Sequence, residues 1–413
     1  MSTGEVDVSD VIARVHRDEW ARIVATLTRR FGDLDVAEEA AADAFATGLT
    51  RWPVDGVPAN PGAWLTTTAR NRAIDRIRRE GTRGVKQQEA VALQHDDVPL
   101  PTGVIDDDRL RLVFTCCHPA LSMEARVALT LRMVGGLTVP EIARAFLVQD
   151  STVGQRISRA KAKITTAGIP YRVPSTDDLP ERVPGVLAVL FLVFNEGYLA
   201  TNRDAEPVRV ELTAEAIRLT RLVRHLLPDD GEVAGLLALM LLIDARRAAR
   251  VSSAGELVTL DQQDRSAWDT SLIAEGHELV RERLRTREAP GRYQILAAIN
   301  SVHTSARTAA DTDWSQIVAL YDLLVRLDPS PVIALNRAIA IGELDGPQVA
   351  LALIDQLADV LAAYHSFHAA RAELLRRLGG NTEAVAAYDR AIDLSSNAAE
   401  IATLTRRRNA LTP

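Results

Sequence analysis

Residues Thr138 to Ile164 read TVPEIARAFLVQDSTVGQRISRAKAKI and predict two short helices joined by a tight turn. Thr138 can cap the first helix, and Glu141, three residues later, can reach back to it, which is the pattern of a capping box. The capping residues at 150–152 predict the start of the second helix. In that second helix apolar residues recur at spacings of four, three and four and form one stripe: Val153, Ile157, Ala160 and Ile164.

The opposite face of the second helix is polar and basic. It carries an amide and several cations, with one lysine at its edge: Gln155, Arg156, Arg159 and Lys163, then Lys161. Two short helices with a tight turn and such an outward face are typical of a DNA-binding helix-turn-helix. The alternative is a plain helical hairpin with a solvated basic face, and this stretch alone favours neither interpretation.

The composition favours an all-α fold, and 413 residues are enough for two to four domains. Because the net charge is −7, any nucleic-acid contact must come from local basic patches. The apolar runs are too short or too interrupted to span a bilayer, so we expect no membrane contact. The absence of a disulfide framework makes a reducing cytoplasm the simplest setting.

The two cysteines, Cys116 and Cys117, are adjacent and are followed by His118. Such a cluster suggests a metal site. Vicinal thiolates bind one metal poorly, however, and no partner pair is near, so we favour a buried packing role. We therefore expect no metal site and no cofactor.

Residues 10–82 predict a first helical unit in which an acidic helix precedes a basic one. Residues Asp35–Leu49 are rich in alanine, and a loop with three prolines at Arg51–Pro61 separates them from a helix at Pro61–Arg79. Cations that follow phosphates, beside an aromatic ring at Trp64, suit single-stranded nucleic acid. For Trp64 itself a core position is the favoured interpretation. The cations of this helix are Arg70, Arg72, Arg76, Arg78 and Arg79.

The rest of the chain predicts a linker and further helical domains. Residues 83–106 lack sustained periodicity and predict a flexible linker. Residues 107–168 predict a second helical unit that ends in the two-helix stretch, and residues 169–310 predict a helical extension.

Residues 311–413 contain an internal repeat with an offset of 34 residues. This period, with small residues where helices cross, resembles tetratricopeptide repeats, whose usual use is a protein-binding groove. The alternative is a helical bundle with accidental periodicity. The aligned pairs include Ala338 with Ala372, Gly346 with Gly380 and Ala350 with Ala384.

Motifs in the two units together resemble extracytoplasmic-function (group IV) RNA polymerase sigma factors over about residues 10–168. In the first unit the matching residues are Trp64, Leu65, Ala69, Arg70, Asn71, Asp75, Arg78 and Arg79. In the second unit they are Ala128, Leu129, Leu131, Arg132, Gly136, Leu137, Thr138, Glu141, Ile142, Ala143, Thr152, Val153, Arg156, Arg159 and Ala160. The large C-terminal extension resembles the subgroup with a tetratricopeptide-like tail.

The resemblance implies three binding surfaces. The acidic helix would contact the clamp of the largest polymerase subunit through Asp35, Glu38, Glu39 and Asp43. The proline-rich loop and the next helix (region 2) would capture a flipped base of the −10 element, and the DNA-binding residues would be Trp64, Thr67, Arg70, Asn71, Arg78 and Arg79. The helix-turn-helix (region 4), which would also meet the flap of the second-largest subunit, would read the −35 element with Ser151, Thr152, Gln155, Arg156, Arg159 and Lys163.

Two positions depart from the family pattern. Leu147 stands in the turn where the family usually has glycine, which predicts a reshaped turn or a packed leucine. Ala42 stands where glutamine is common, which weakens the residue-level expectations for the polymerase contact.

The partners we expect are RNA polymerase core, promoter DNA and a regulatory protein at the tail, which we expect to regulate the factor in cis. One alternative is a dimeric helix-turn-helix transcription regulator that acts on duplex DNA without polymerase. Such a regulator does not need the basic helix beside an acidic docking helix. Another alternative is an enzyme in the C-terminal domain, but we find no convergent polar site there and expect no catalytic residues.

Overall fold

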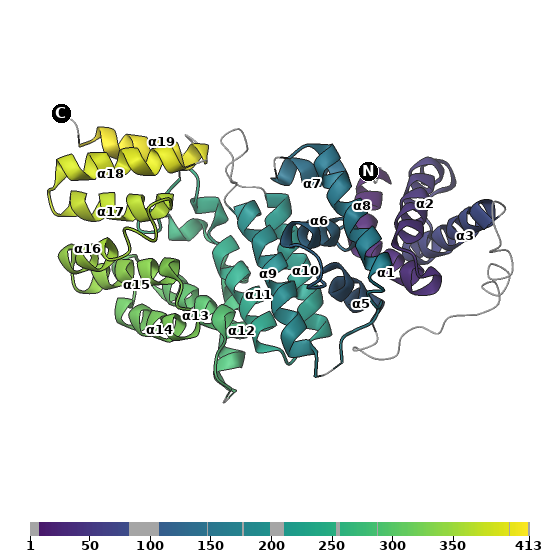
Figure 1. The fold of residues 1–413 in the computed structure, drawn as a ribbon, viewed down its shortest axis with the longest axis horizontal. Coiled ribbons are helices and arrows are strands. Elements are labelled where there is room, and N and C mark those ends of the chain that lie inside the picture. The colour runs from purple at the N-terminus through teal and green to yellow at the C-terminus, as the bar shows by residue number, and fades with distance from the viewer. Residues whose placement is uncertain are drawn as a thin grey trace, which may run out of the picture. The chain divides into compact units, whose positions relative to one another are not determined.

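The computed structural model describes residues 8–81, 107–146, 148–175, 177–198, 210–252, 257–286, 288–395 and 397–411. Within these ranges the chain is helical, and the only β structure is an isolated antiparallel bridge between Val251 and Leu257 (Figure 1). The predicted all-α class is therefore confirmed. The predicted linker at 83–106 and the turn residue Leu147 lie outside the described residues.

The chain divides into two compact units. The first comprises Met1–Leu192 with His225–Leu227, and the second comprises Val193–Arg224 with Pro228–Pro413. The first unit thus reaches past residue 168, where we expected the second helical domain to end. The finer domain boundaries stay predictions.

Three helices form the first part of the first unit: α1 (Val8–Phe31), α2 (Leu34–Asp55) and α3 (Pro61–Gly81). Gly32 ends α1 with a φ of 67°, and the Asp33 side chain then caps α2 by accepting from two backbone N–H groups. The apolar faces of α1, α2 and α3 pack together and form the core of this part.

The predicted loop at Arg51–Pro61 is wrong in its first half, because α2 continues through Pro53 to Asp55. The buried Trp52 anchors this last turn and is only 2% exposed. Gly56, with a φ of 82°, then ends the helix by donating its N–H to the Trp52 carbonyl at 3.1 Å. Burial of one large ring therefore outweighs the lost hydrogen bond of a proline near a helix end.

Four more helices follow between residues 108 and 166: α5 (Asp108–Cys116), α6 (Met123–Met133), α7 (Val139–Phe146) and α8 (Asp150–Thr166). The capping box of α7 is confirmed. The Thr138 N–H donates to Glu141 Oε2 at 2.6 Å, and the Glu141 N–H donates to Thr138 Oγ1 at 3.3 Å. The predicted cap of α8 is wrong, because the helix starts one residue earlier and its N-cap is Gln149, without a side-chain hydrogen bond.

Both cysteines are buried, in agreement with the packing role that we favoured. The Cys117 Sγ lies 3.4 Å from Thr130 Oγ1. Burial raises the pKa of the Cys117 thiol to about 11.

The second unit is built from successive helices, and two elements, α9 (Leu179–Tyr198) and α10 (Val210–Leu226), cross the boundary between the units. Residues 247–249 and 265–267 form short 3-10 turns. None of the described helices is both long and apolar enough to cross a membrane. The remaining helices are α11 (Gly231–Asp244), α12 (Thr270–Leu284), α13 (Arg292–Ser305), α14 (Trp314–Leu327), α15 (Pro331–Leu344), α16 (Pro347–Asp355), α17 (His365–Arg377), α18 (Asn381–Leu394) and α19 (Ala398–Asn409).

The predicted offset of 34 residues is present in the helix starts: α15 and α17 begin 34 residues apart, and so do α16 and α18 (Figure 1). The equivalent residues Ala350 and Ala384 are both fully buried. A Cβ at Gly342 would lie 2.7 Å from the Ala350 Cβ, so α15 and α16 cross closely. The tetratricopeptide assignment itself stays a prediction.

Candidate nucleic-acid interface

Helix α8 separates an apolar stripe from a polar face, as its sequence predicts. Val153, Ile157, Ala160 and Ile164 are buried. All six residues predicted to read DNA lie within an arc of about 140° on the other side, at 100° per residue. Four of them are exposed and two are half-buried: Ser151, Gln155, Arg159 and Lys163, then Thr152 and Arg156.

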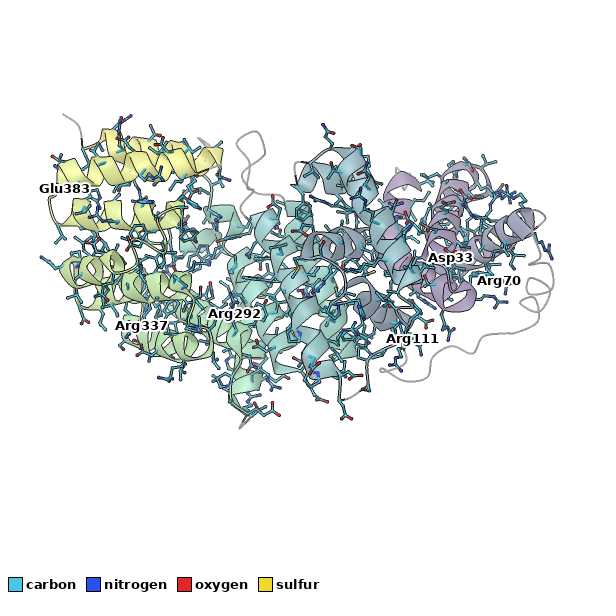
Figure 2. All side chains as sticks on the ribbon, in the orientation of Figure 1. Asp33, Arg70, Arg111, Arg292, Arg337 and Glu383 are labelled. Carbon is cyan, nitrogen blue, oxygen red and sulfur yellow. The ribbon has the colours of Figure 1, made fainter. Side chains whose placement is uncertain are left out.

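Helix α3 carries the second predicted DNA-binding set. Trp64 is half-buried, between the core position that we favoured and an exposed one, and its ring meets the Trp52 ring edge-on at 5.5 Å. The sequence did not predict that Trp52 is buried beside Trp64, because its only signal was a large aromatic residue next to a proline. The other five members of the set are exposed: Thr67, Arg70, Asn71, Arg78 and Arg79. Figure 2 labels Arg70 on this helix.

The four acidic residues predicted to contact polymerase have different environments. Asp35, Glu39 and Asp43 are exposed. Glu39 forms an ion pair with Arg76 of α3. Glu38, by contrast, is only 9% exposed.

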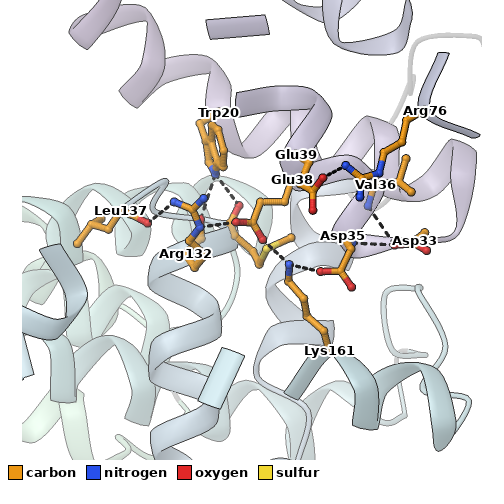
Figure 3. Close-up of polar contacts among 11 residues, drawn as sticks. Trp20, Asp33, Asp35, Val36, Glu38, Glu39, Arg76, Arg132, Leu137 and Lys161 are labelled. Atoms are coloured by element: carbon orange, nitrogen blue, oxygen red, sulfur yellow. Dashed lines mark hydrogen bonds and ion pairs between the residues drawn. The ribbon is translucent and has the colours of Figure 1, made fainter. Parts of the chain in front are cut away.

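Glu38 is held by two cations from α6 and α8 (Figure 3). The Arg132 Nε donates to Glu38 Oε1 at 2.5 Å. The Lys161 Nζ donates to Glu38 Oε2 and, at 2.7 Å, to Asp35 Oδ1. We call Asp35, Glu38, Arg132 and Lys161 the Glu38 cluster. Its cations come from α6 and α8, and its carboxylates come from α2.

Lys161 is therefore not at the edge of the outward basic face, where the sequence suggested it would lie. It is 7% exposed and points toward α2. In the helical register it stands four residues after the buried Ile157, which places it next to the apolar stripe. That position makes it either a rim residue or a buried one, and only the presence of α2 decides between them.

The backbone around Arg132 is fixed by Trp20 of α1. The Trp20 Nε1–H lies 3.2 Å from the carbonyls of both Arg132 and Met133. The Arg132 guanidinium lies over the Trp20 ring at 5.6 Å and donates to the Leu137 carbonyl at 2.9 Å. A Cβ at Gly136 would lie 2.9 Å from the Trp20 ring, so only glycine fits beside it.

A second set of contacts joins α1 to the start of α5. The Arg29 Nε lies 3.1 Å from Asp108 Oδ2. Burial raises the pKa of Asp108, although Arg111 and Arg29 oppose the shift. The Tyr171 hydroxyl lies 3.0 Å from the Ala25 carbonyl and 3.1 Å from the Asp108 carbonyl. Helices α1–α3 and α5–α8 are thus in direct polar contact at two places.

Comparison with protein families gives matches for both halves of this unit. Residues 17–83 match the family described as Sigma-70 region 2, and residues 111–164 match Sigma-70, region 4. The chain thus carries both of these regions of an RNA polymerase sigma factor. Residues 182–284 of this sigma factor match a family of unknown function, DUF6596.

Individual relatives cover the sigma factor to different extents. The uncharacterized protein R00370 of Rhizobium meliloti (strain 1021) is 42% identical over 406 residues, which cover 97% of this chain and 94% of that protein. The ECF RNA polymerase sigma factor SigK of Mycobacterium ulcerans (strain Agy99) is 29% identical over 161 residues, 36% of this chain and 85% of SigK. The SigK of Mycobacterium tuberculosis (strain H37Rv) is 29% identical over 147 residues, 34% of this chain and 76% of that protein. No solved structure matches.

The Glu38 cluster predicts that two neighbouring lysines of α8 differ in their effect on stability. Lys161→Met removes two charge-assisted hydrogen bonds and should lower the free energy of unfolding of the first unit by about 1–3 kcal/mol. Lys163→Met removes the same charge from the exposed face and should change the free energy of unfolding by less than about 0.5 kcal/mol. Urea denaturation of the two full-length variants measures both changes in the free energy of unfolding. Equal effects would contradict a structural role for Lys161.

Proposed function

We propose that this sigma factor binds core RNA polymerase and directs promoter-specific initiation, with region 2 reading and melting the −10 element and region 4 reading the −35 element. The observation that carries the proposal is the polar face of α8. All six predicted DNA-reading residues lie on this face, whereas the apolar stripe is buried. A recognition helix needs this arrangement to enter the major groove while it stays packed on its own domain.

The chemistry of the α8 face suits base and phosphate contacts. Arg156 and Arg159 can form bidentate contacts with guanine, and Gln155 can do the same with adenine. Ser151, Thr152 and Lys163 carry short hydroxyls and a point charge, which suit phosphate contacts that fix the register.

The α3 face suits melted DNA. Arg70, Arg78 and Arg79 supply cations for the backbone, and Thr67 and Asn71 supply hydrogen bonds to a flipped base. The half-buried Trp64, supported from behind by Trp52, lies at the start of the same helix.

The contact between the two regions bears on how the factor would engage a promoter. The −10 and −35 elements are centred about 25 base pairs apart, which is about 85 Å of B-DNA at about 3.4 Å per base pair. Regions joined by the hydrogen bonds of the Glu38 cluster cannot reach both elements at once. We therefore propose that the arrangement described above is a closed state of the factor.

In this closed state the polymerase-facing residues are only partly available. Asp35, Glu39 and Asp43 are exposed, but Lys161 occupies Asp35 and Glu38. We propose that docking of α2 on the clamp of the largest subunit displaces Lys161, and that region 4, once released, contacts the flap of the second-largest subunit. Docking and opening are then one step, because the clamp and Lys161 compete for the same carboxylates.

Run-off transcription with purified core polymerase on genomic promoter fragments tests the function. We expect specific initiation that requires the protein. Arg159→Ala should lower initiation about tenfold, because one bidentate base contact is worth about 1–3 kcal/mol. Arg172→Ala removes the same charge from an exposed position outside α8 and should leave initiation unchanged. Duplex binding without core polymerase, and no initiation with it, would instead favour the dimeric regulator.

We also propose that the C-terminal extension regulates the factor in cis and offers a surface for a regulatory protein. Two observations support this: the DUF6596 match lies in the extension, and the full-length relative shares the extension. The first turn of α9 contacts the sigma regions, since Arg182 donates to the Phe114 carbonyl at 2.9 Å.

A chain that ends at Tyr198 tests this regulation, because it keeps α9 whole. If the extension regulates the sigma regions, the shortened chain should initiate at a rate several-fold different from the full chain, in one direction or the other. Circular dichroism and urea denaturation check that the sigma regions remain folded. Unchanged transcription and unchanged partner binding would contradict a regulatory extension.

A further inference from the structure

The second unit contains a cavity of about 850 Å³ whose lining is rich in arginine. Its volume falls within the range of small-molecule sites, about 300–1,000 Å³. The 3-10 turn at 265–267, the start of α14, and the ends of α15, α17 and α19 contribute to its walls. Five arginines face three carboxylates there: Arg265, Arg376, Arg377, Arg406 and Arg407, against Asp261, Glu343 and Glu373.

Two of these carboxylates are already shared among three of the arginines. The Arg377 Nη1 lies 2.6 Å from Glu343 Oε1. Glu373 pairs with the Arg376 Nη2 at 2.5 Å and with the Arg407 Nη1 at 3.7 Å. The pairs neutralise part of the lining and leave an excess of positive charge in the cavity.

Arg265 lines the cavity and forms no close ion pair among the described residues, although the charge of Asp311 favours its protonated form from farther away. Its Nη1 donates to two backbone carbonyls, those of His303 and Ala306, both at 2.7 Å. Its guanidinium lies over the Trp268 ring at 4.5 Å. Its Nη2 is buried and has no hydrogen-bond partner. An arginine whose guanidinium is held by two carbonyls and a ring is preorganised for an anion in the cavity that it lines.

A second arginine, Arg246, and the uncharged ring of His303 lie near Arg265, and Arg246 adds to the positive potential. Arg246 is 9% exposed, and burial lowers its pKa to about 10. It donates to Asn300 Oδ1 at 3.0 Å, while its Nε has no partner. Burial, with Arg246 and Arg265 nearby, lowers the pKa of His303 to about 4, and its Nδ1 is also unpartnered. Arg246 also lowers the pKa of Arg265, so a nearby anion would stabilise the charge of both arginines.

The cavity also has an aromatic wall. The His303 and Trp314 rings both line it and meet edge-on at 5.3 Å. Flat apolar surface beside a few directed cations is the usual composition of a site for an organic ligand rather than for a bare ion.

We propose that this cavity binds a small organic anion through a carboxylate or phosphate group, with Arg265 of the 3-10 turn and Arg406 of α19 as its cationic contacts. The site would make the extension a sensor of a metabolite-sized anion. The binding itself needs neither polymerase nor DNA, so its test is independent of the proposed transcription function.

Isothermal titration calorimetry of the full-length protein tests the site, with citrate as the carboxylate probe and inorganic phosphate as the phosphate probe. We expect saturable binding of at least one probe, and the stronger of the two identifies the group that the site prefers. The affinity should fall as ionic strength rises.

Substitutions of the lining arginines test whether the probe binds in this cavity. Arg265→Gln and Arg406→Gln should each weaken it about tenfold, the usual cost of losing a hydrogen bond to a charged group. Arg281→Gln, which removes the same charge from the exposed face of α12, should bind as the wild type does. Arg406 is exposed, so its variant should fold even if Arg265→Gln does not. The absence of saturable binding to either probe, or binding that Arg406→Gln leaves unchanged, would overturn the proposal.

Discussion

One buried carboxylate, Glu38, determines how the two sigma regions of this protein are joined. Burying a carboxylate costs several kcal/mol unless it is paired and hydrogen-bonded. Glu38 meets that requirement with Arg132 on one oxygen and Lys161 on the other. Because these partners come from α6 and α8, both pairs can form only where α2 packs against both helices.

The same cluster links stability to function. Lys161 lies in α8 but faces away from the residues that we propose read DNA, so the helix has a packing side and a reading side. The acidic helix α2 likewise presents Asp35 and Glu38 to Lys161, and Glu39 and Asp43 to its surroundings. A factor built this way can hold its two regions together while free and exchange that contact for polymerase, since both use the charges of α2.

The sequence was sufficient for features that depend on local chemistry. The capping box at Thr138 and Glu141, the buried stripe of α8 and the 34-residue offset of the C-terminal helices all follow from residue spacing. Features that depend on a distant partner were not predictable. Pro53 lies within a helix because Trp52 is buried, and Lys161 is buried because α2 lies beside it.

The cavity of the extension is also a feature that depends on residues distant in sequence. Arg246, Arg265 and His303 are separated widely in sequence, and nothing in their local pattern distinguishes them from solvated residues. Only the fold places them together, and the resulting excess of positive charge favours an anion. Isolated basic residues in a helical chain are therefore poor predictors of a site, whereas unpartnered buried ones are informative.

The distance between α2 and α8 in solution tests the closed state most directly. Spin labels on Ala46→Cys and Ala162→Cys, both exposed positions, report it, and the native cysteines are buried. We expect one short distance in the free protein and a distance longer by tens of ångströms when core polymerase is added. The same short distance in a transcriptionally active complex would contradict the account.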